Sequence, residues 1–409
     1  MPSRGRTSDP FIIPWRPGLF KHNPFPITNT GRVTALPWNG ASRYNTAMNG
    51  EKVVVAMSGG VDSSVAAHLL KEHGYEVLGV FMCAGPGVEL PAGGPPRCRS
   101  AEDSACVRAV AGQLGFPFAV LDFAPDFNRL IDHFCAEYGR GRTPNPCILC
   151  NRDLKFGRLF EYADAMGARC VATGHYARVE WEAGQWRLKR ALDRAKDQSY
   201  FLFPIPPQRL ERVRLPLGEM TKDATRRLAR DLGLPVHNRP ESQDICFAGG
   251  GVGNLVRQRR PDLVRPGPIL DLDGNELGRH EGIVHFTIGQ RRGLGIAVGE
   301  PRYVVAIRAE DAAVIVGPAE ALRSRGLAAE EVVWHETAPA EPIRADVQIR
   351  YRHPAAPAWI ARPDGETDGG GRAEVTFDEP QTAVTPGQAA VFYRDDRVLG
   401  GGWIREARG

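Results

Sequence analysis

The feature that most constrains the fold is a short strand–turn–helix stretch near residue 55. The run KVVVAM at Lys52–Met57 is apolar and β-branched, which is typical of a strand buried on both faces of a parallel sheet. It passes directly into SGGVDSS at Ser58–Ser64, and then into VAAHLLKEHG, whose apolar spacing and closing Gly74 predict a helix. Two glycines between a buried strand and a helix N-terminus leave backbone amides free, and this arrangement favours an anion site.

The same alternation continues for more than a hundred residues. Strands and helices are predicted in turn at Glu76–Met82, Glu102–Leu114, Phe118–Asp122, Phe127–Tyr138, Asp153–Met166 and Arg169–Ala172. This order predicts an α/β domain with a doubly wound parallel sheet. In such sheets ligands bind at the carboxyl ends of the strands, which is where the SGGVDSS loop lies.

The pattern changes beyond residue 250. The stretches Gly282–Gly295 and Tyr303–Arg308 are typical of a small mixed domain, and from about residue 325 short alternating strands recur between Pro and Gly turns, as expected for a small antiparallel barrel. We therefore expect a disordered or mis-assigned N-terminal extension at 1–47 and an α/β catalytic domain at 48–250. A small central domain at 251–322 and a C-terminal antiparallel β-barrel at 323–409 would follow.

Charge separates the N-terminal extension from the rest of the chain. The first 50 residues carry six basic side chains and one acid, so a net charge of +4 leaves the remainder near −1. Nucleic-acid binding by the remainder would therefore need local basic patches. The extension is rich in Pro and Gly, and a transit peptide or a start at Met48 are both open interpretations.

Cysteine content and hydropathy restrict the compartment. Eight cysteines without a secretory signal indicate a reducing compartment, and we expect a cytoplasmic protein. No apolar run approaches the length of a transmembrane helix, so an integral membrane protein is excluded at this level.

The SGGVDSS loop is the sharpest chemical signal. Ser58, Ser63 and Ser64 add hydroxyl donors to the loop amides, and Asp62 is a suitable Mg²⁺ ligand. The loop lacks the GxxxxGK[ST] spacing and its lysine, and it is not GxGxxG. It resembles the PP-loop of ATP pyrophosphatases, which cleave ATP between the α and β phosphates and adenylate a carbonyl oxygen. A glycine turn with an N-capping serine is the structural alternative.

Two cysteine motifs are candidate thiol sites. Cys147-Ile-Leu-Cys150 is predicted to lie in a proline-rich loop directly before a helix, where the helix dipole favours thiolate. Cys246 lies far along the chain in ESQDICF. A thioredoxin-like pair, or half of a zinc site completed by Cys98 and Cys106, remain open for the CxxC motif, and Cys246 alone would more often be buried filler. Buried filler is also the expectation for Cys83, Cys98, Cys106, Cys135 and Cys170.

Seven motifs occur in a fixed order along the chain. They are SGGVDSS, TPNPCILCN, ATGHY, KDQSYFL, ESQDICF, TIGQRRGLG and TPGQAAVFY. Together they closely resemble the bacterial tRNA-specific 2-thiouridylase family, over roughly residues 50–405. The resemblance implies a tRNA sulfurtransferase that uses ATP to make 2-thiouridine at the wobble position of Lys/Glu/Gln-type tRNAs. It also implies a sulfur donor from a cysteine desulfurase relay, and no membrane partner.

The resemblance implies residue roles as well. The ATP contacts would be Ala56, Met57, Ser58, Gly59, Gly60, Val61, Asp62, Ser63, Met82 and Gly174. Cys150 would be the nucleophile and Cys246 the persulfide carrier, and the two would form a transient disulfide. The target base would lie among Asn145, Pro146 and Cys147. The tRNA contacts would be His175, Lys196, Asp197, Gln198, Arg350, Tyr351 and Gln388.

One position departs from the commoner family pattern, which has an aspartate where this chain has Cys147. The departure removes a carboxylate from the site and adds a third thiol. The set Cys147, Cys150 and Cys246 would then be able to hold a [4Fe–4S] cluster with one iron open to sulfide, as an alternative to persulfide exchange alone.

Two other functions remain open from the residues. Another PP-loop enzyme, such as a small-molecule ligase, would need the loop but neither Cys150 nor Cys246. An RNA-binding protein with an inactive nucleotide site is the second alternative, although the intact Asp62 and serines count against it.

Overall fold

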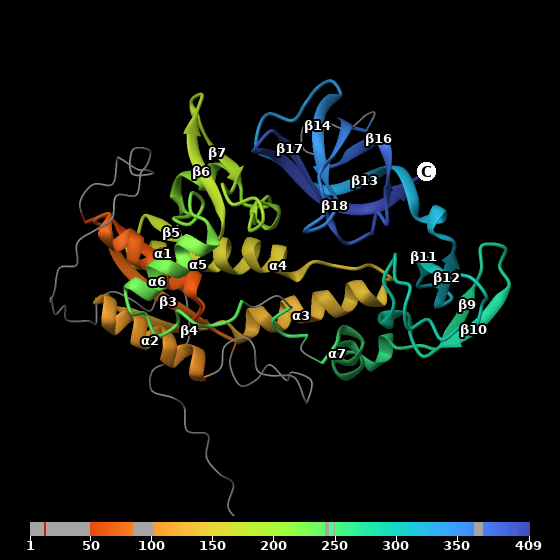
Figure 1. The fold of residues 1–409 in the computed structure, drawn as a ribbon, viewed down its shortest axis with the longest axis horizontal. Helices are drawn as coiled ribbons and strands as arrows, with labels where there is room; N and C mark the ends of the chain where they lie inside the picture. Colours follow the sequence, from red (N-terminus) through yellow and green to blue (C-terminus); the bar gives the residue numbers. More distant parts are fainter. Residues whose placement is uncertain (1–11, 14–49, 85–100, 242–244, 249, 364–370) are drawn as a thin grey trace, which may run out of the picture.

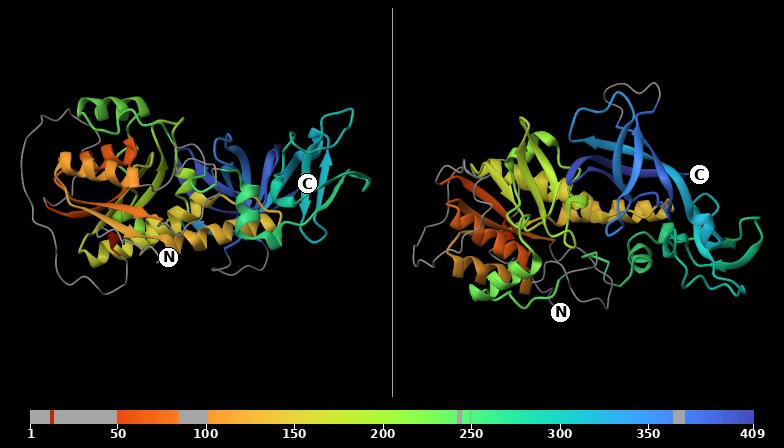
Figure 2. Two further views of the ribbon diagram at one scale, coloured as in Figure 1. Left: turned by 90° about the horizontal axis from the view of Figure 1, so that it is seen from below. Right: turned by 45° about the horizontal axis from the view of Figure 1, so that its top comes forward.

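The structure, a computed structural model, describes residues 12–13, 50–84, 101–241, 245–248, 250–363 and 371–409. Three sheets organise these residues: a parallel sheet, a small central sheet and a closed barrel (Figure 1). In Figure 1 the parallel sheet lies at one end of the molecule and the central sheet at the other, with the barrel above. Figure 2 shows the same arrangement from two further directions.

The parallel sheet has the strand order β1-β4-β3-β2-β5-β8. All of its pairings are parallel, including β2 with β3 and β2 with β5, which sets β2 at the centre. Its strands are β1 (Ile12–Ile13), β2 (Lys52–Met57), β3 (Glu76–Cys83), β4 (Phe118–Asp122), β5 (Cys170–Ala172) and β8 (Val213–Arg214). The doubly wound parallel sheet expected from the sequence is confirmed.

Alternate residues of β2 enter two different cores. Val53, Val55 and Met57 pack with α1, α2 and α6, whereas Val54 and Ala56 pack with α3 and the helix that follows the CxxC motif. Successive side chains of a strand point to opposite faces, so a continuous apolar run means helices on both faces. The helices of the domain are α1 (Val61–Glu72), α2 (Ala101–Leu114), α3 (Ala124–Gly139), α4 (Pro146–Leu149), η2 (Cys150–Arg158), α5 (Leu159–Ala165), η3 (Ser199–Phe201), η4 (Pro207–Arg212) and α6 (Lys222–Asp231).

The CxxC segment differs from the sequence expectation. We predicted a loop followed by a helix from Asp153, but the helix begins at Pro146, so Cys147 and Cys150 are helical residues. Asn145 caps the helix: its side-chain Oδ1 accepts a hydrogen bond from the Cys147 amide at 3.1 Å. Asn is a preferred N-cap, and proline at the first helical position has a suitable φ and needs no N–H partner. The NP pair therefore starts a helix where we expected a loop.

Helix α3 links the two ends of the molecule, as Figure 1 shows. Its far end contacts α7 (Val252–Arg259) and η6 (Ile283–His285) of the central part. There the four-stranded sheet has the order β10-β9-β12-β11, a small mixed unit as expected. The remaining elements of this part are η5 (Pro261–Leu263), β9 (Gly267–Leu270), β10 (Glu276–His280), β11 (Tyr303–Arg308), β12 (Ala313–Gly317) and η7 (Ala319–Leu322).

The C-terminal strands close into an antiparallel barrel of order β13-β16-β15-β14-β17-β18, because β13 also pairs with β18. Their bounds are β13 (Arg323–Trp334), β14 (Ile343–Gln348), β15 (Ala356–Ala361), β16 (Ala373–Thr382), β17 (Ala389–Arg394) and β18 (Arg397–Arg408). The barrel prediction is confirmed. A hairpin from the first domain, β6 (Ala177–Glu182) and β7 (Gln185–Arg190), joins this sheet through Arg397 opposite Lys189. The sequence analysis did not predict that hairpin.

Two remaining expectations concern the N-terminal extension and membrane-spanning helices. Within the N-terminal extension, Ile12–Ile13 form a short strand that pairs in parallel with Val120 and Leu121. A disordered segment would contain no such strand. The rest of that expectation lies outside the described residues. Among the helices of the described residues, none is both long and apolar enough to cross a membrane.

Candidate active site

The SGGVDSS loop turns between β2 and α1 at the carboxyl edge of the parallel sheet. Gly59 has φ +77, a conformation that side chains with a Cβ rarely adopt, so the first glycine is needed for the turn. The loop is held by its serines: Ser63 Oγ accepts from the Ser58 amide at 3.2 Å, and Ser64 Oγ donates to the Gly60 carbonyl at 2.9 Å. Gly60 is the N-cap of α1 and makes no side-chain cap, so the helix start is not covered by a capping side chain. The geometry suits an anion at this point.

The predicted nucleotide residues come together at this edge. Met57 lies opposite Phe81 in the sheet, which places Met82 one residue further along the neighbouring strand, and Val55 lies opposite Ala172, two residues before Gly174. Ala56, Met57, Val61 and Met82 are buried. Gly174 touches the loop itself: a Cβ built on it would lie 2.7 Å from the Ser63 nitrogen. Any side chain here would push the loop away.

Asp62 is held by a lysine that the sequence analysis missed. Lys222 Nζ lies 2.7 Å from both carboxylate oxygens of Asp62, and the hydroxyl of Tyr176 donates to the same carboxylate at 3.0 Å. Lys222 is buried and is the first residue of α6, whose N-cap Thr221 accepts from the Ala224 amide. The loop therefore has a lysine after all, supplied 160 residues later in the chain.

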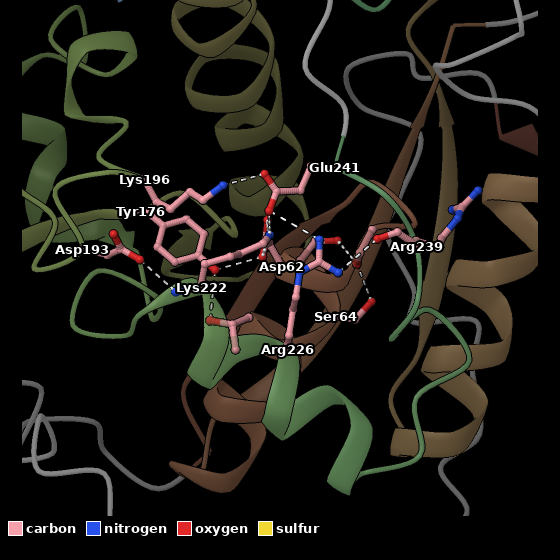
Figure 3. A network of polar contacts seen from close by, with 12 residues as sticks. Asp62, Ser64, Tyr176, Asp193, Lys196, Lys222, Arg226, Arg239 and Glu241 are labelled. Carbon is pink, nitrogen blue, oxygen red and sulfur yellow. Dashed lines mark hydrogen bonds and ion pairs between the residues drawn. The ribbon is translucent and has the colours of Figure 1, made fainter. Parts of the chain in front are cut away.

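The lysine is part of a wider polar network, drawn in Figure 3. The carboxylate of Glu241 lies 2.8 Å from Lys196 Nζ and 3.4 Å from both Lys222 Nζ and Arg226 Nη2. Partial burial alone would raise the pKa of Glu241, but the hydrogen bond from Lys196 and the charge of Lys222 outweigh it and lower the pKa to about 2. Glu241 is thus a firmly ionised carboxylate beside the loop.

Burial and a neighbouring carboxylate also act on the tyrosine of this network. Burial and the charge of Asp62 raise the pKa of the Tyr176 hydroxyl, which donates its proton to Asp62 and lies 3.0 Å from Thr225 Oγ1. A hydroxyl with a raised pKa stays protonated and serves as a fixed donor. Tyr176 therefore orients Asp62 and does not act as a base.

A second buried contact joins the nucleotide loop to the helical segment 146–158, which carries Cys147 and Cys150 and is called the thiol helix below. His175 follows Gly174 and bonds Thr173 Oγ1 through Nδ1 at 2.7 Å, while its Nε2 lies 3.4 Å from Lys155 Nζ. Burial, and then the charge of Lys155, lower the pKa of His175 well below its usual value, so the ring is neutral and accepts from the lysine. Lys155 lies in η2, the helix that begins at Cys150.

The thiol helix has an unusual geometry. Residues Cys150–Arg158 are π-helical, with non-helical dihedrals at Phe156, and a π-helical stretch brings residues five apart onto one face. Cys150 and Lys155 therefore share a face. Cys150 is half-buried against the core, whereas Cys147 is exposed and Pro146 is buried. Among residues 146–150, Cys147 is thus the most exposed.

Cys246 lies in the short described segment 245–248. It is half-buried, and the next residue, Phe247, packs edge-on against Phe134 of α3 at 5.3 Å between ring centroids. Among the described residues, which include Cys147, Cys150 and Cys246, no group of three or more His, Cys, Asp or Glu side chains could hold a metal ion. Of the cysteines expected to be buried filler, Cys135 and Cys170 are buried, Cys83 and Cys106 are half-buried, and Cys98 lies outside the described residues.

The KDQ motif, expected to contact tRNA, is largely engaged within the chain. Asp197 is buried and accepts from the amides of Ala191 and Ser199. Gln198 and Tyr176 exchange two hydrogen bonds, at 2.7 and 2.9 Å, which pins the motif to the residue after His175. His175 itself is buried, so its ring faces Lys155 and not the surface. Lys196 is the member of the motif with a substantially exposed side chain, at 35%.

The predicted barrel residues fasten the barrel to the first domain. Gln388 Nε2 donates to the Thr143 carbonyl at 2.6 Å, two residues before the Asn145 cap. The ring of Tyr351 packs on Phe201 at 4.4 Å between centroids, and Arg350 donates to the Thr382 and Ala383 carbonyls. Tyr351, expected to contact tRNA, therefore packs against Phe201 of the first domain. The sequence alone gave no indication of either contact.

One sequence signal for Lys222 existed. A lysine in the first turn of a helix is unfavourable beside the positive end of the helix dipole, so its presence directly after an N-cap threonine indicates a constraint of another kind. Lys155 and Glu241 gave no comparable signal, because charged residues in a helix or a polar loop are ordinary.

Sequence comparisons match the whole described architecture to known families. Residues 51–250 match the tRNA methyl transferase HUP domain, residues 255–318 the tRNA methyl transferase PRC-barrel domain and residues 324–404 the aminomethyltransferase beta-barrel domain. A solved structure of a 4-thiouridine synthetase–RNA complex with bound ATP aligns over 52% of this chain and 51% of its own, at 18% identity. Its TM-score of 0.33 is too low to carry a conclusion.

Full-length relatives give a closer match. The tRNA-specific 2-thiouridylase of Rhodopirellula baltica is 45% identical over 87% of this chain and 96% of its own length. One from Syntrophus aciditrophicus is 48% identical over 87% and 93%, and one from Chloroflexus aggregans 48% identical over 86% and 98%. Identity at this level along almost the entire length of the relatives means that this chain belongs to the tRNA-specific 2-thiouridylase family.

Proposed function

We propose that this protein is an ATP-dependent tRNA sulfurtransferase that converts the wobble uridine of tRNA to 2-thiouridine. The observation that carries the proposal is the direct link between two sites. Gly174 contacts the SGGVDSS loop, and the adjacent His175 contacts Lys155 of the helix that begins at Cys150. A nucleotide-activating loop and a thiol are thereby joined by two consecutive residues, which suits a reaction that activates an oxygen and then replaces it with sulfur.

The first half of the proposed reaction is adenylation. The C2 oxygen of the uridine attacks the α-phosphate of ATP, pyrophosphate leaves, and the oxygen becomes part of an AMP leaving group. The loop amides and the start of α1 would bind the phosphates, and Lys222 would supply positive charge beside them. Gly174 allows the segment that carries His175 to lie directly against the loop.

The second half is sulfur transfer. The terminal sulfur of a persulfide on Cys246 attacks C2, and AMP departs with the original oxygen. The Cys150 thiolate then attacks the Cys246 sulfur, which releases the thiocarbonyl and leaves a Cys150–Cys246 disulfide for an external thiol to reduce. Lys155, five residues after Cys150 in the same helical segment, contacts His175. The target base would lie against Asn145, Pro146 and Cys147 at the start of this helix.

Mg²⁺ belongs to the proposal. When bound, Mg²⁺ would neutralise charge on the leaving pyrophosphate. Asp62 fits as its single protein ligand, because Mg²⁺ commonly takes one or two carboxylates together with substrate phosphates, and Asp62 is about one-third exposed.

The [4Fe–4S] alternative does not fit the described residues. Three thiolates within ligand distance of one cluster would form a group of three metal-ligating side chains, and none is present there. We therefore derive no step through a cluster, and Cys147 has no assigned chemical role.

The partners remain part of the proposal. A cysteine desulfurase relay would supply the persulfide sulfur, and Lys/Glu/Gln-type tRNAs would be the substrates. Lys196 is the cation that we assign to a tRNA phosphate, because its side chain is 35% exposed and lies beside Glu241 at the edge of the nucleotide site. The protein would act where its tRNA and sulfur donor are found, in the cytoplasm.

The test is nucleoside analysis of product tRNA. Unmodified tRNA is incubated with the protein, ATP, Mg²⁺ and a persulfide-generating desulfurase, digested, and analysed by mass spectrometry. We expect 2-thiouridine with the wild type, and none with Cys150→Ser or Cys246→Ser. Cys106→Ser is the matched control, since that thiol on α2 is half-buried like Cys150 and Cys246 and has no role in the proposed reaction. A small-molecule ligase would survive all three substitutions, and an RNA-binding protein would show no ATP–pyrophosphate exchange.

A further inference from the structure

A loop of the C-terminal barrel holds the residue that leads into the thiol helix. The loop joins β16 to β17 and makes two hydrogen bonds with Thr143: the Thr143 amide donates to the Pro386 carbonyl at 2.9 Å, and its carbonyl accepts from Gln388 Nε2 at 2.6 Å. Between them lies Gly387, which has φ +90, and a Cβ built on it would lie 2.9 Å from the Thr143 nitrogen. The barrel therefore satisfies both backbone polar groups of Thr143.

This loop is itself fixed in the barrel. The Gln388 carbonyl accepts from the Ile404 amide at 2.7 Å, and the Gln388 amide donates to the Thr385 carbonyl at 3.2 Å. The Gly387 amide donates to the Ile404 carbonyl at 2.9 Å. Ile404 lies in β18, whose pairing with β13 closes the barrel. The side chain of Gln388 thus starts from an ordered backbone and can hold Thr143 at a defined position.

The link from Thr143 to the thiol helix is short and stiff. It consists of Pro144, Asn145 and Pro146. The two prolines have a fixed φ, and each restricts the residue before it to extended backbone. Asn145 is extended, with φ −104 and ψ 99, and it caps the helix by accepting from the Cys147 amide. A displacement of Thr143 is therefore passed on to the start of the thiol helix.

Ion pairs to a single barrel strand lie on both sides of the two cysteines. Before them, Arg142 Nη2 lies 2.9 Å from a carboxylate oxygen of Glu330. After them, Arg152 Nη1 lies 3.3 Å from a carboxylate oxygen of Glu331. Consecutive side chains of a regular strand point to opposite faces, but β13 has an irregularity between Glu330 and Val333, with Glu331 at φ +49. Two neighbouring glutamates of the barrel can therefore both reach the segment that carries the thiols.

We propose that Gln388 is a positioning residue that acts through Thr143: it fixes the start of the thiol helix and thereby places Cys150 for sulfur transfer. The inference rests on the proposed function for the role of Cys150. A tRNA contact, which is the role that the family resemblance implies for Gln388, would act on tRNA affinity. A positioning residue acts instead on the rate of the bound complex, and on the order of the helix start in the free protein.

The first measurement uses the free protein. Hydrogen exchange of the peptide that covers residues 146–158 is followed by mass spectrometry. Gln388→Met keeps the length of the side chain but removes the donor, so the Thr143 carbonyl loses this partner. We expect exchange at the helix start to become about three- to tenfold faster, while exchange in α1 stays unchanged. The matched control is Gln381→Met, because Gln381 is also half-buried and donates its Nε2 to a backbone carbonyl, that of Glu379 in the same strand. Gln381→Met should exchange like wild type in the thiol helix.

The second measurement separates rate from affinity. For Gln388→Met we expect kcat for 2-thiouridine formation to fall by about three- to tenfold, while the Kd for tRNA stays within about twofold of wild type. Gln388→Lys keeps a donor of similar reach and should recover most of the lost rate. Gln381→Met should match wild type in both kcat and Kd.

Two outcomes would overturn the inference. One is exchange at the helix start that does not respond to Gln388→Met, because the barrel loop would then not fix that helix. The other is weaker tRNA binding at an unchanged kcat, which would make Gln388 a tRNA contact. The exchange measurement uses neither tRNA nor a sulfur donor. A wild type that forms no 2-thiouridine would therefore refute the proposed function, and the exchange result would still decide whether Gln388 fixes the thiol helix.

Discussion

Gly174→Ala tests whether the close approach of two loops is what shapes the nucleotide site. The added Cβ would lie 2.7 Å from the Ser63 nitrogen and from the Asp62 carbonyl carbon, and 3.0 Å from the Asp62 oxygen. Ordinary contact begins near 3.4 Å, so the loop or the Gly174 segment must move by about 0.7 Å. All three atoms belong to the backbone, and no flexible side chain is available to yield.

The magnitude follows from this geometry. Overpacking of this kind typically costs about 1–3 kcal/mol of unfolding free energy. To bind phosphates, the displaced loop would have to return to its original position, and the strain would then oppose binding. Because about 1.4 kcal/mol corresponds to a factor of ten, we expect the nucleotide affinity to weaken by about five- to a hundredfold. The Asp62–Lys222 contact, at 2.7 Å, moves with the loop and should loosen as well.

The assay pairs calorimetry of α,β-methylene-ATP binding with urea unfolding. The matched control is Gly112→Ala on α2, where an added Cβ meets no atom within 4 Å and the position is exposed. Alanine is the better helix former, so Gly112→Ala should raise the unfolding free energy by about 0.5–1 kcal/mol and leave nucleotide binding unchanged. Wild-type nucleotide affinity in Gly174→Ala would refute the reasoning, since it would mean that the loop position is not needed for binding.

Three further predictions concern charged residues and thiols of the site. Lys222→Met should lower the rate of tRNA adenylation by about a hundredfold or more while tRNA binding persists, measured as pyrophosphate release in a single turnover; a normal rate would remove Lys222 from phosphate stabilisation. Lys196→Ala should weaken tRNA binding and make the salt dependence shallower by about one unit, and an unchanged slope would place Lys196 away from the phosphates. Cys147→Asp should keep thiolation activity, measured as 2-thiouridine formed; loss of both activity and iron from anaerobically purified protein would instead favour a cluster.

Much of the first domain could be predicted from local pattern. The strand Phe118–Asp122 and the helix of α1 lie where the sequence placed them, because buried parallel strands and amphipathic helices have distinct periodicities. The carboxyl edge of the sheet then follows from topology, and with it the neighbourhood of the SGGVDSS loop, Met82 and Gly174. The helix start at Pro146 was also readable from the NP pair, and our prediction of a loop there was wrong.

The sequence by itself thus determined the fold class, the turn at Gly59 and the family to which the chain belongs. These depend on backbone preference and on hydrophobic pattern, both of which are local. Tertiary structure alone decided that Lys222 reaches Asp62, that Lys155 meets His175 and that Glu241 lies among three cations. Contacts between residues up to 160 positions apart depend on how helices cross the sheet, and a charged residue has no periodic signature that announces its partner. The chemistry of the site is therefore assembled by the fold from residues that look ordinary in the chain.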